Sequence, residues 1–136
     1  MNYAKKVLFV DDDADDQYLF KDALSELQNV PECIIANNGL DALEKIAWPP
    51  PPDIIFLDIN MPVMDGFECL SILKRQDRYK DIPVIIYSTS SQPNDVERSK
   101  KLGASLFLTK PNNFTFLIEA LNKILSFDFK KDDFAF

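Results

Sequence analysis

Two of the most apolar segments of the sequence are followed directly by aspartates. Asp11–Asp13 come after Val7–Val10, and Asp58 comes after Ile54–Leu57. Short, continuous apolar segments are typical of strands that are buried in a parallel sheet. The carboxyl ends of neighbouring parallel strands meet at one edge of such a sheet, so we expect these carboxylates to converge there.

The convergence of Asp11, Asp12 and Asp58 would create a site for a metal ion. Closely packed carboxylates raise one another's pKa unless a cation lies among them. Oxygen ligands with few carboxylates and several waters suit Mg²⁺, so Mg²⁺ is the expected ion. Helix capping is the alternative role for these aspartates. We assign that role to Asp13, which stands three residues before Asp16.

Two later polar residues are expected at the same edge. Ser88 follows the apolar segment Val84–Tyr87, and Lys110 follows the shorter segment Leu106–Leu108. A metal ion, a carboxylate, a hydroxyl and an ammonium together suit phosphoryl transfer, which depends on positioning and on charge neutralisation. The alternative for Lys110 is a simple counter-ion for the aspartates. The chain has no histidine, so any phosphohistidine must come from a partner protein.

Strands and amphipathic helices alternate along the chain. Besides the segments above, Cys33–Ala36 is an expected strand. Between the strands, apolar residues recur at helical spacing. The stripes expected to face the core are Phe20, Ala23, Leu24 and Leu27; Leu40, Leu43 and Ala47; Phe67, Leu70 and Leu73; and Phe114, Leu117, Ile118, Leu121 and Leu125. This alternation predicts an α/β fold, a doubly wound, flavodoxin-like sheet of five parallel strands in the order 2-1-3-4-5 with helices on both faces.

The fourth expected helix, roughly Asn94–Leu102, differs from the others. Val96 and Leu102 are almost its only large apolar residues, and Gly103 is expected to end it. A helix that buries so little apolar surface should be held by a small margin of free energy, which is either a plain structural feature or an indication of mobility.

Composition limits the number of domains and the kinds of partner. A chain of 136 residues fits one domain, and we expect that domain at 1–127, followed by a tail at 128–136 and no output domain. A net charge of -7 argues against nucleic acid and against an anionic membrane as the main partner. The apolar segments are far shorter than the roughly 20 residues of a membrane span, and we expect a cytoplasmic protein.

Four motifs, in this order, resemble those of the response-regulator receiver family. They are Val10-Asp11-Asp12, the segment from Leu57 to Gly66, the segment from Pro83 to Ser88, and Lys110-Pro111. The resemblance runs from about Lys5 to Leu125 and implies a receiver domain of two-component signalling, similar to the single-domain chemotaxis regulators.

The resemblance implies which residues carry the chemistry. Asp58 is then the phosphoacceptor, which attacks a phosphohistidine on a histidine kinase or a histidine phosphotransfer protein. Asp11, Asp12 and Asp58 hold Mg²⁺, and Asn60 offers its backbone carbonyl to the same ion.

The resemblance also implies how the signal would spread. Ser88 donates its hydroxyl to one phosphoryl oxygen, and Lys110 pairs with another. Phe107 occupies the family's aromatic switch position and turns into the space that Ser88 leaves, although a plain core role is the alternative. The surface of the fourth helix, fifth strand and fifth helix then changes. The peptide bond between Lys110 and Pro111 is expected to be cis.

Two other functions fit parts of this pattern. A Mg²⁺-dependent phosphohydrolase also uses an aspartate nucleophile, but it places a second acid two residues later, where this chain has Asn60. A pseudo-receiver would keep the fold without the chemistry, but all the expected site positions carry competent residues. We therefore expect a signalling phosphoacceptor rather than an enzyme. Its output would pass to a downstream protein target, whose identity the sequence does not give, or to onward phosphotransfer.

Overall fold

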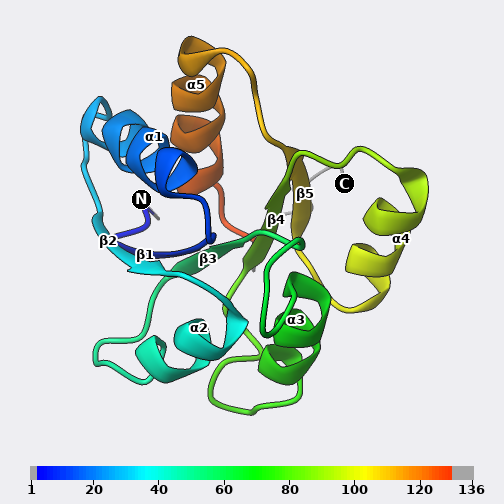
Figure 1. Ribbon diagram of the computed structural model, residues 1–136. Helices are drawn as coiled ribbons and strands as arrows, with labels where there is room; N and C mark the ends of the chain where they lie inside the picture. The colour runs from blue at the N-terminus through cyan, green and yellow to red at the C-terminus, as the bar shows by residue number, and fades with distance from the viewer. Residues whose placement is uncertain (1–2, 130–136) are drawn as a thin grey trace.

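The computed structural model, which describes residues 3–129, contains one sheet of five parallel strands (Figure 1). The strand order is β2-β1-β3-β4-β5, so the predicted fold class and order are confirmed. The strands are β1 (Lys6–Val10), β2 (Glu32–Ala36), β3 (Ile54–Leu57), β4 (Val84–Ser88) and β5 (Leu106–Thr109). Each predicted strand is present, and its bounds differ from the prediction by at most one residue at either end. Most of the expected tail, residues 130–136, lies outside the described residues.

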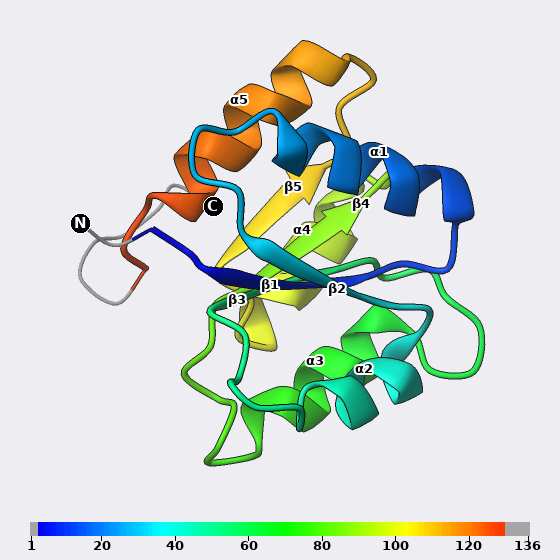
Figure 2. The ribbon, with the colours of Figure 1, turned by 90° about the vertical axis from the view of Figure 1, so that its left-hand side faces the viewer.

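Helices cover both faces of the sheet (Figure 2). On one face lie α1 (Ala14–Ser25) and α5 (Phe114–Leu125), and on the other lie α2 (Gly39–Lys45) and α3 (Gly66–Lys74). The remaining helix, α4 (Pro93–Lys101), lies beside β5 (Figure 1). Within residues 3–129, no helix has both the length and the apolar character that a membrane span requires.

The three central strands, β1, β3 and β4, are buried along their whole length. On the face of α1 and α5, the rings of Phe9 and Phe20 stack with their centroids 3.9 Å apart. Phe56 and Tyr87 meet the Phe20 ring edge-on, at centroid distances of 5.0 and 5.8 Å. Such aromatic contacts add to the burial of apolar area, so this cluster fixes α1 firmly against the ends of β1 and β4.

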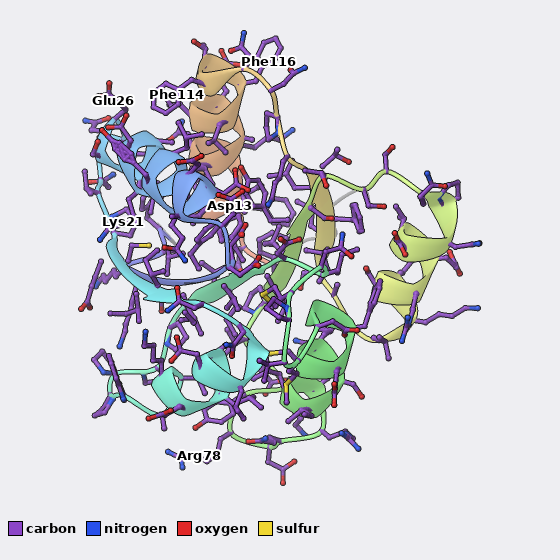
Figure 3. The ribbon with its side chains drawn as sticks, viewed as in Figure 1. Asp13, Lys21, Glu26, Arg78, Phe114 and Phe116 are labelled. Atoms are coloured by element: carbon purple, nitrogen blue, oxygen red, sulfur yellow. The ribbon has the colours of Figure 1, made fainter. Side chains whose placement is uncertain are left out.

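Two of the predicted apolar stripes are partly wrong. The side chain of Leu40 in α2 is 56% exposed, and Ala42 and Ile46, one helical turn apart, face the core instead. Phe114, the first residue of α5 (labelled in Figure 3), is 37% exposed, whereas Ile124 is buried. Leu40 and Phe114 lie in the first turn of a helix, and the predicted core residue Ala47, which is also exposed, lies beyond the end of α2.

The helix α4 is held weakly, as its composition predicts. Ser99 is its buried residue, and the N-cap residue Gln92 makes no side-chain hydrogen bond to the helix. Gly103 follows the C-cap with a φ of 102°, so the predicted helix end is confirmed. Few buried residues and a poor N-cap agree with a small free energy of local unfolding, which stays a prediction.

The chain makes a tight turn between β3 and α3 that presses against the end of the strand. Met64 N donates to Pro62 O at 2.8 Å, and the residue between them, Val63, has a φ of 71°, which is the pattern of a γ-turn. Gly66 N then donates to Ile59 O at 3.1 Å. The approach is so close that a Cβ at Gly66 would clash with the carbonyl oxygen of Asp58. The turn therefore restricts the backbone around Asp58.

Substitution of Gly66 tests this close approach. Gly66→Ala is expected to lower the free energy of unfolding by about 3 kcal/mol, because the new Cβ meets backbone atoms that cannot move independently. Gly103→Ala is the control: its Cβ would lie 3.2 Å from the flexible side chain of Lys74, and the positive φ should cost about 1–2 kcal/mol. Urea unfolding followed by circular dichroism measures both. A loss at Gly66 no larger than that at Gly103 would contradict the tight turn.

Candidate functional site

The ends of β1 and β3 bring two buried aspartates side by side. Asp11 N donates to Ala36 O and Asp58 N donates to Val10 O, both at 3.0 Å, so the strand pairing continues past the last strand residues. One carboxylate oxygen each from Asp11, Asp12 and Asp58 lies within 4.8 Å of the others. Asp11 and Asp58 are buried and Asp12 is exposed. The predicted convergence of the three carboxylates is confirmed.

Lys110 reaches into the same cluster from the end of β5. Its Nζ lies 2.8 Å from Asp11 Oδ2, 2.7 Å from Asp16 Oδ2 and 3.4 Å from Asp58 Oδ2. The ammonium also lies 5.5 Å from the centre of the Tyr87 ring, which is part of the aromatic cluster on the face of α1 and α5. The lysine side chain is only 10% exposed, so the apolar core and the carboxylates together hold it in place.

Burial and charge act against each other on these groups. Burial raises the pKa of Asp11 and of Asp58 above the ordinary range, and the neighbouring Lys110 offsets only part of this effect. Burial by itself would lower the pKa of Lys110, but hydrogen bonds to Asp11 and Asp16 and the charge of Asp58 outweigh it and raise the pKa. Three carboxylates thus contact one ammonium, and the carboxylate of Asp12 lies beside those of Asp11 and Asp58. The cluster lacks positive charge, and a divalent cation would supply it.

Asp13 caps the following helix, as predicted. Its Oδ1 accepts hydrogen bonds from the backbone N–H groups of Asp15, at 2.8 Å, and Asp16, at 3.5 Å. Figure 3 shows Asp13 at the start of α1. Its carboxylate is therefore committed to the helix end and is not part of the group that could hold a metal ion.

Ser88 ends β4 and is completely buried. Its Oγ accepts a hydrogen bond from Ser90 N at 3.1 Å, and its carbonyl accepts one from Lys110 N at 2.7 Å. Phe107, which pairs with Ile86 in the sheet, is partly buried and packs against the core of α2 and α3. The structure thus places both predicted switch residues on the adjacent strands β4 and β5, and their movement remains a prediction.

The peptide bond between Lys110 and Pro111 is trans, so the predicted cis bond is wrong; within the described residues the cis bond joins Pro49 and Pro50. Lys110 is aimed inward by other means. Its backbone extends the β4–β5 pairing through the bond to Ser88 O, and its ion pairs draw the side chain over the sheet edge. A cis bond is not needed to direct the lysine.

Asn60 also lies beside the cluster. Its backbone N–H donates to Asp58 Oδ1 at 3.4 Å, and its side chain is exposed. The position two residues after Asp58 therefore holds an amide, which cannot supply the proton of a general acid.

Sequence reasoning missed two residues of the first turn of α1. Asp16 was considered as the residue three positions after the Asp13 cap, yet it forms the shortest of the three ion pairs of Lys110. Gln17 Nε2 donates to Asp11 O at 2.6 Å and to Asn37 Oδ1 at 2.9 Å, which ties the end of β1 to the end of β2. Both residues lie in the first turn of α1, a few residues after the end of β1, and this closeness to the predicted cluster could have indicated them.

Comparison with known proteins agrees with this geometry. Residues 7–122 match the family model of the response regulator receiver domain. The chain belongs to this family. Such domains are signalling phosphoacceptors of two-component systems, and the acidic cluster, the fold and the strand order found here are those that the family resemblance implies.

Individual relatives cover nearly the whole chain. It is 33% identical to the response regulator Rcp1 of a Synechocystis species, over 93% of this chain and 90% of that protein. It is 32% identical to the polar-differentiation response regulator DivK of Brucella anthropi, over 89% of this chain and 96% of that protein. The solved structure of Rcp1 in its Mn²⁺-bound form superimposes with a TM-score of 0.80 at 33% identity, covering 90% of this chain and 93% of that one.

The division of labour between Asp12 and Asp13 gives a prediction. Asp12→Ala is expected to weaken Mg²⁺ binding by at least tenfold with little effect on stability, because it removes one carboxylate of the cluster. Asp13→Ala should leave Mg²⁺ binding within about twofold while lowering the free energy of unfolding by about 1 kcal/mol through loss of the cap. Isothermal titration with Mg²⁺ and urea unfolding measure the two effects. Equal losses of Mg²⁺ affinity in both variants would mean that the pocket lies one residue further along the chain.

Proposed function

We propose that this receiver domain accepts a phosphoryl group on Asp58 from the phosphohistidine of a histidine kinase or a histidine phosphotransfer protein. A carboxylate oxygen of Asp58 attacks the phosphorus, an O–P bond forms and the P–N bond breaks. The electron pair of the broken bond returns to the imidazole nitrogen of the partner. The product is an aspartyl phosphate, a kind of covalent intermediate for which carboxylate nucleophiles are well known.

The observation that carries this proposal is the difference between the two buried carboxylates. Asp11 is held tightly, with Oδ2 2.8 Å from Lys110 Nζ and Oδ1 2.9 Å from Asp13 N. The corresponding contacts of Asp58, to Lys110 Nζ and to Asn60 N, are both 3.4 Å long. A nucleophile must have an oxygen free to attack, and Asp58 meets that requirement better than Asp11 does.

The donor set fits Mg²⁺. The carboxylates of Asp11, Asp12 and Asp58 and the backbone carbonyl of Asn60 are hard oxygen ligands, and the exposure of Asp12 leaves room for the waters that Mg²⁺ retains. When bound, Mg²⁺ would neutralise the negative charge that accumulates as an anionic phosphodonor approaches the carboxylates.

Ser88 and Lys110 would stabilise the phosphoryl group once it is attached. The hydroxyl hydrogen of Ser88 can turn toward the pocket, since its oxygen serves as the acceptor for Ser90 N. Lys110 already lies 3.4 Å from Asp58 Oδ2, so a small movement would bring its ammonium to a phosphoryl oxygen. Charge-assisted hydrogen bonds of this kind are stronger than neutral ones.

Replacement of the acceptor tests the proposal. With Mg²⁺ and acetyl phosphate, the wild-type chain should gain the mass of one phosphoryl group, and Asp58→Asn should gain none because the amide is not a nucleophile. Asp77→Asn, which removes the same charge from a side chain that is 95% exposed, is the control and should be labelled like wild type. Intact mass spectrometry measures the gain. Label that persists in Asp58→Asn, or that maps to Ser88, would overturn the assignment.

The phosphohydrolase alternative is disfavoured by Asn60. Its amide stands where such an enzyme needs a second acid, and its backbone N–H already contacts Asp58. Sustained turnover of a phosphomonoester, beyond one equivalent, would revive this alternative.

A chain of hydrogen bonds suggests how phosphorylation would reach α4. Ser90 N donates to Ser88 Oγ at 3.1 Å, and Ser90 Oγ donates to Asp95 Oδ2 in the first turn of α4 at 2.6 Å. If Ser88 turned toward the phosphoryl group, Ser90 would lose an acceptor and α4 would lose part of its anchor. New bonds from Ser88 and Lys110, worth about 2–4 kcal/mol together, would suffice to shift a helix that is held so weakly. Phe107 would then turn toward the space that Ser88 leaves, and the α4–β5–α5 surface would change.

Hydrogen exchange tests this path. In the presence of Mg²⁺, beryllofluoride should change amide exchange most in residues 90–101. Ser90→Ala should show much of that change before beryllofluoride is added, because the bond to Asp95 is missing. Ser126→Ala is the control, since its hydroxyl bonds to Asn122 O at the far end of α5. Changes confined to the surroundings of Asp58, or found mainly on α1, would place the switch elsewhere.

A further inference from the structure

The ion pair between Asp16 and Lys110 is not explained by the chemistry above. Its distance of 2.7 Å is the shortest of the three ion pairs of the lysine. The other two partners, Asp11 and Asp58, belong to the group of carboxylates that can hold a metal ion, and Asp16 does not. Asp16 comes from the first turn of α1, whose end is fixed by the Asp13 cap.

Metal binding would leave Lys110 with this one carboxylate. Oxygens of Asp11 and Asp58 that serve a divalent cation are poor partners for an ammonium, because the two positive charges repel each other at short distance. Lys110 cannot withdraw far, since its side chain is 90% buried and packs over the Tyr87 ring. Asp16 lies within ion-pair distance of Lys110 and is not part of the group that could bind the metal ion.

We propose that Asp16 is a positioning residue that holds Lys110 in the metal-loaded, unphosphorylated state. The phosphoryl group must then compete with the Asp16 carboxylate for Lys110. This inference rests on the proposed function of Asp58. Asp16 would then set a threshold for the switch: Lys110 stays beside the site but pairs with a phosphoryl oxygen only when that oxygen outcompetes the Asp16 carboxylate.

The strength of the pair suits such a role. The Asp16 side chain is 28% exposed, whereas Asp11 is 1% exposed. Water can replace Lys110 at Asp16 at low cost, so the pair is weak enough to exchange, as partly exposed ion pairs generally are. A fully buried partner would leave an uncompensated charge and would hold the lysine permanently.

Beryllofluoride, which forms a mimic of the phosphoryl group on the acceptor carboxylate, provides the test. At saturating Mg²⁺, Asp16→Asn should bind beryllofluoride about three- to fivefold more tightly than wild type, because no carboxylate competes for Lys110. Asp15→Asn is the matched control: it removes the same charge from the same helical turn, at a residue that is exposed and makes no ion pair with Lys110. It should bind within about twofold of wild type. Isothermal titration measures the affinities, and circular dichroism verifies the fold.

A second pair of variants separates competition for Lys110 from simple charge repulsion. In a Lys110→Met background, Asp16→Asn should no longer raise the affinity for beryllofluoride. An equal gain in that background, or no gain in the wild-type background, would overturn the positioning role. Failure of wild-type protein to bind beryllofluoride at all would instead overturn the proposed function of Asp58, so the two failures are distinguishable.

Discussion

The structure depends on the crowding of carboxylates at one edge of a parallel sheet. Strands β1 and β3 are neighbours, so Asp11 and Asp58 must end side by side, and both are buried. Lys110 alone cannot balance their charge together with that of Asp12 and Asp16. Such a cluster is costly in a folded protein unless cations enter it. This cost falls at the edge of the sheet where the acidic cluster suits a divalent metal ion and where we propose that the phosphoryl group is attached.

Around that cluster, one part of the molecule is packed tightly and another part is packed loosely. The stacked and edge-on aromatic rings behind Tyr87 and the tight turn at Gly66 fix the carboxylates and the base of Lys110. On the other side, α4 buries only Ser99 among its own residues and is anchored through Ser90 and Asp95. A change of charge at the rigid edge is therefore expected to alter the position of α4 more than that of the other helices. Ser88 is hydrogen-bonded both to Lys110, through its carbonyl, and to Ser90, through its hydroxyl, so it links the site to the proposed output surface.

Much of this could be predicted from the sequence, for reasons that lie in the pattern of apolar residues. Buried strands such as Ile54–Leu57 are continuous apolar segments, and an aspartate directly after one is placed by the strand itself. The errors concern features that depend on three-dimensional packing. The exposure of Leu40 depends on how a short helix packs on the sheet, and the isomer of the bond before Pro111 was inferred from the family resemblance rather than from a pattern of residues. The Asp16 ion pair was missed because an acid in the first turn of a helix already has a local explanation in the helix dipole.

The most direct test of this account is a crystal structure of the chain with Mg²⁺ and beryllofluoride. The account predicts one Mg²⁺ ion bound by Asp11, Asp12 and Asp58, beryllofluoride on Asp58, and Lys110 Nζ in contact with a fluorine atom and separated from Asp16. A metal ion bound away from the three aspartates would contradict it, as would a Lys110 that keeps its ion pair with Asp16 and makes no contact with beryllofluoride.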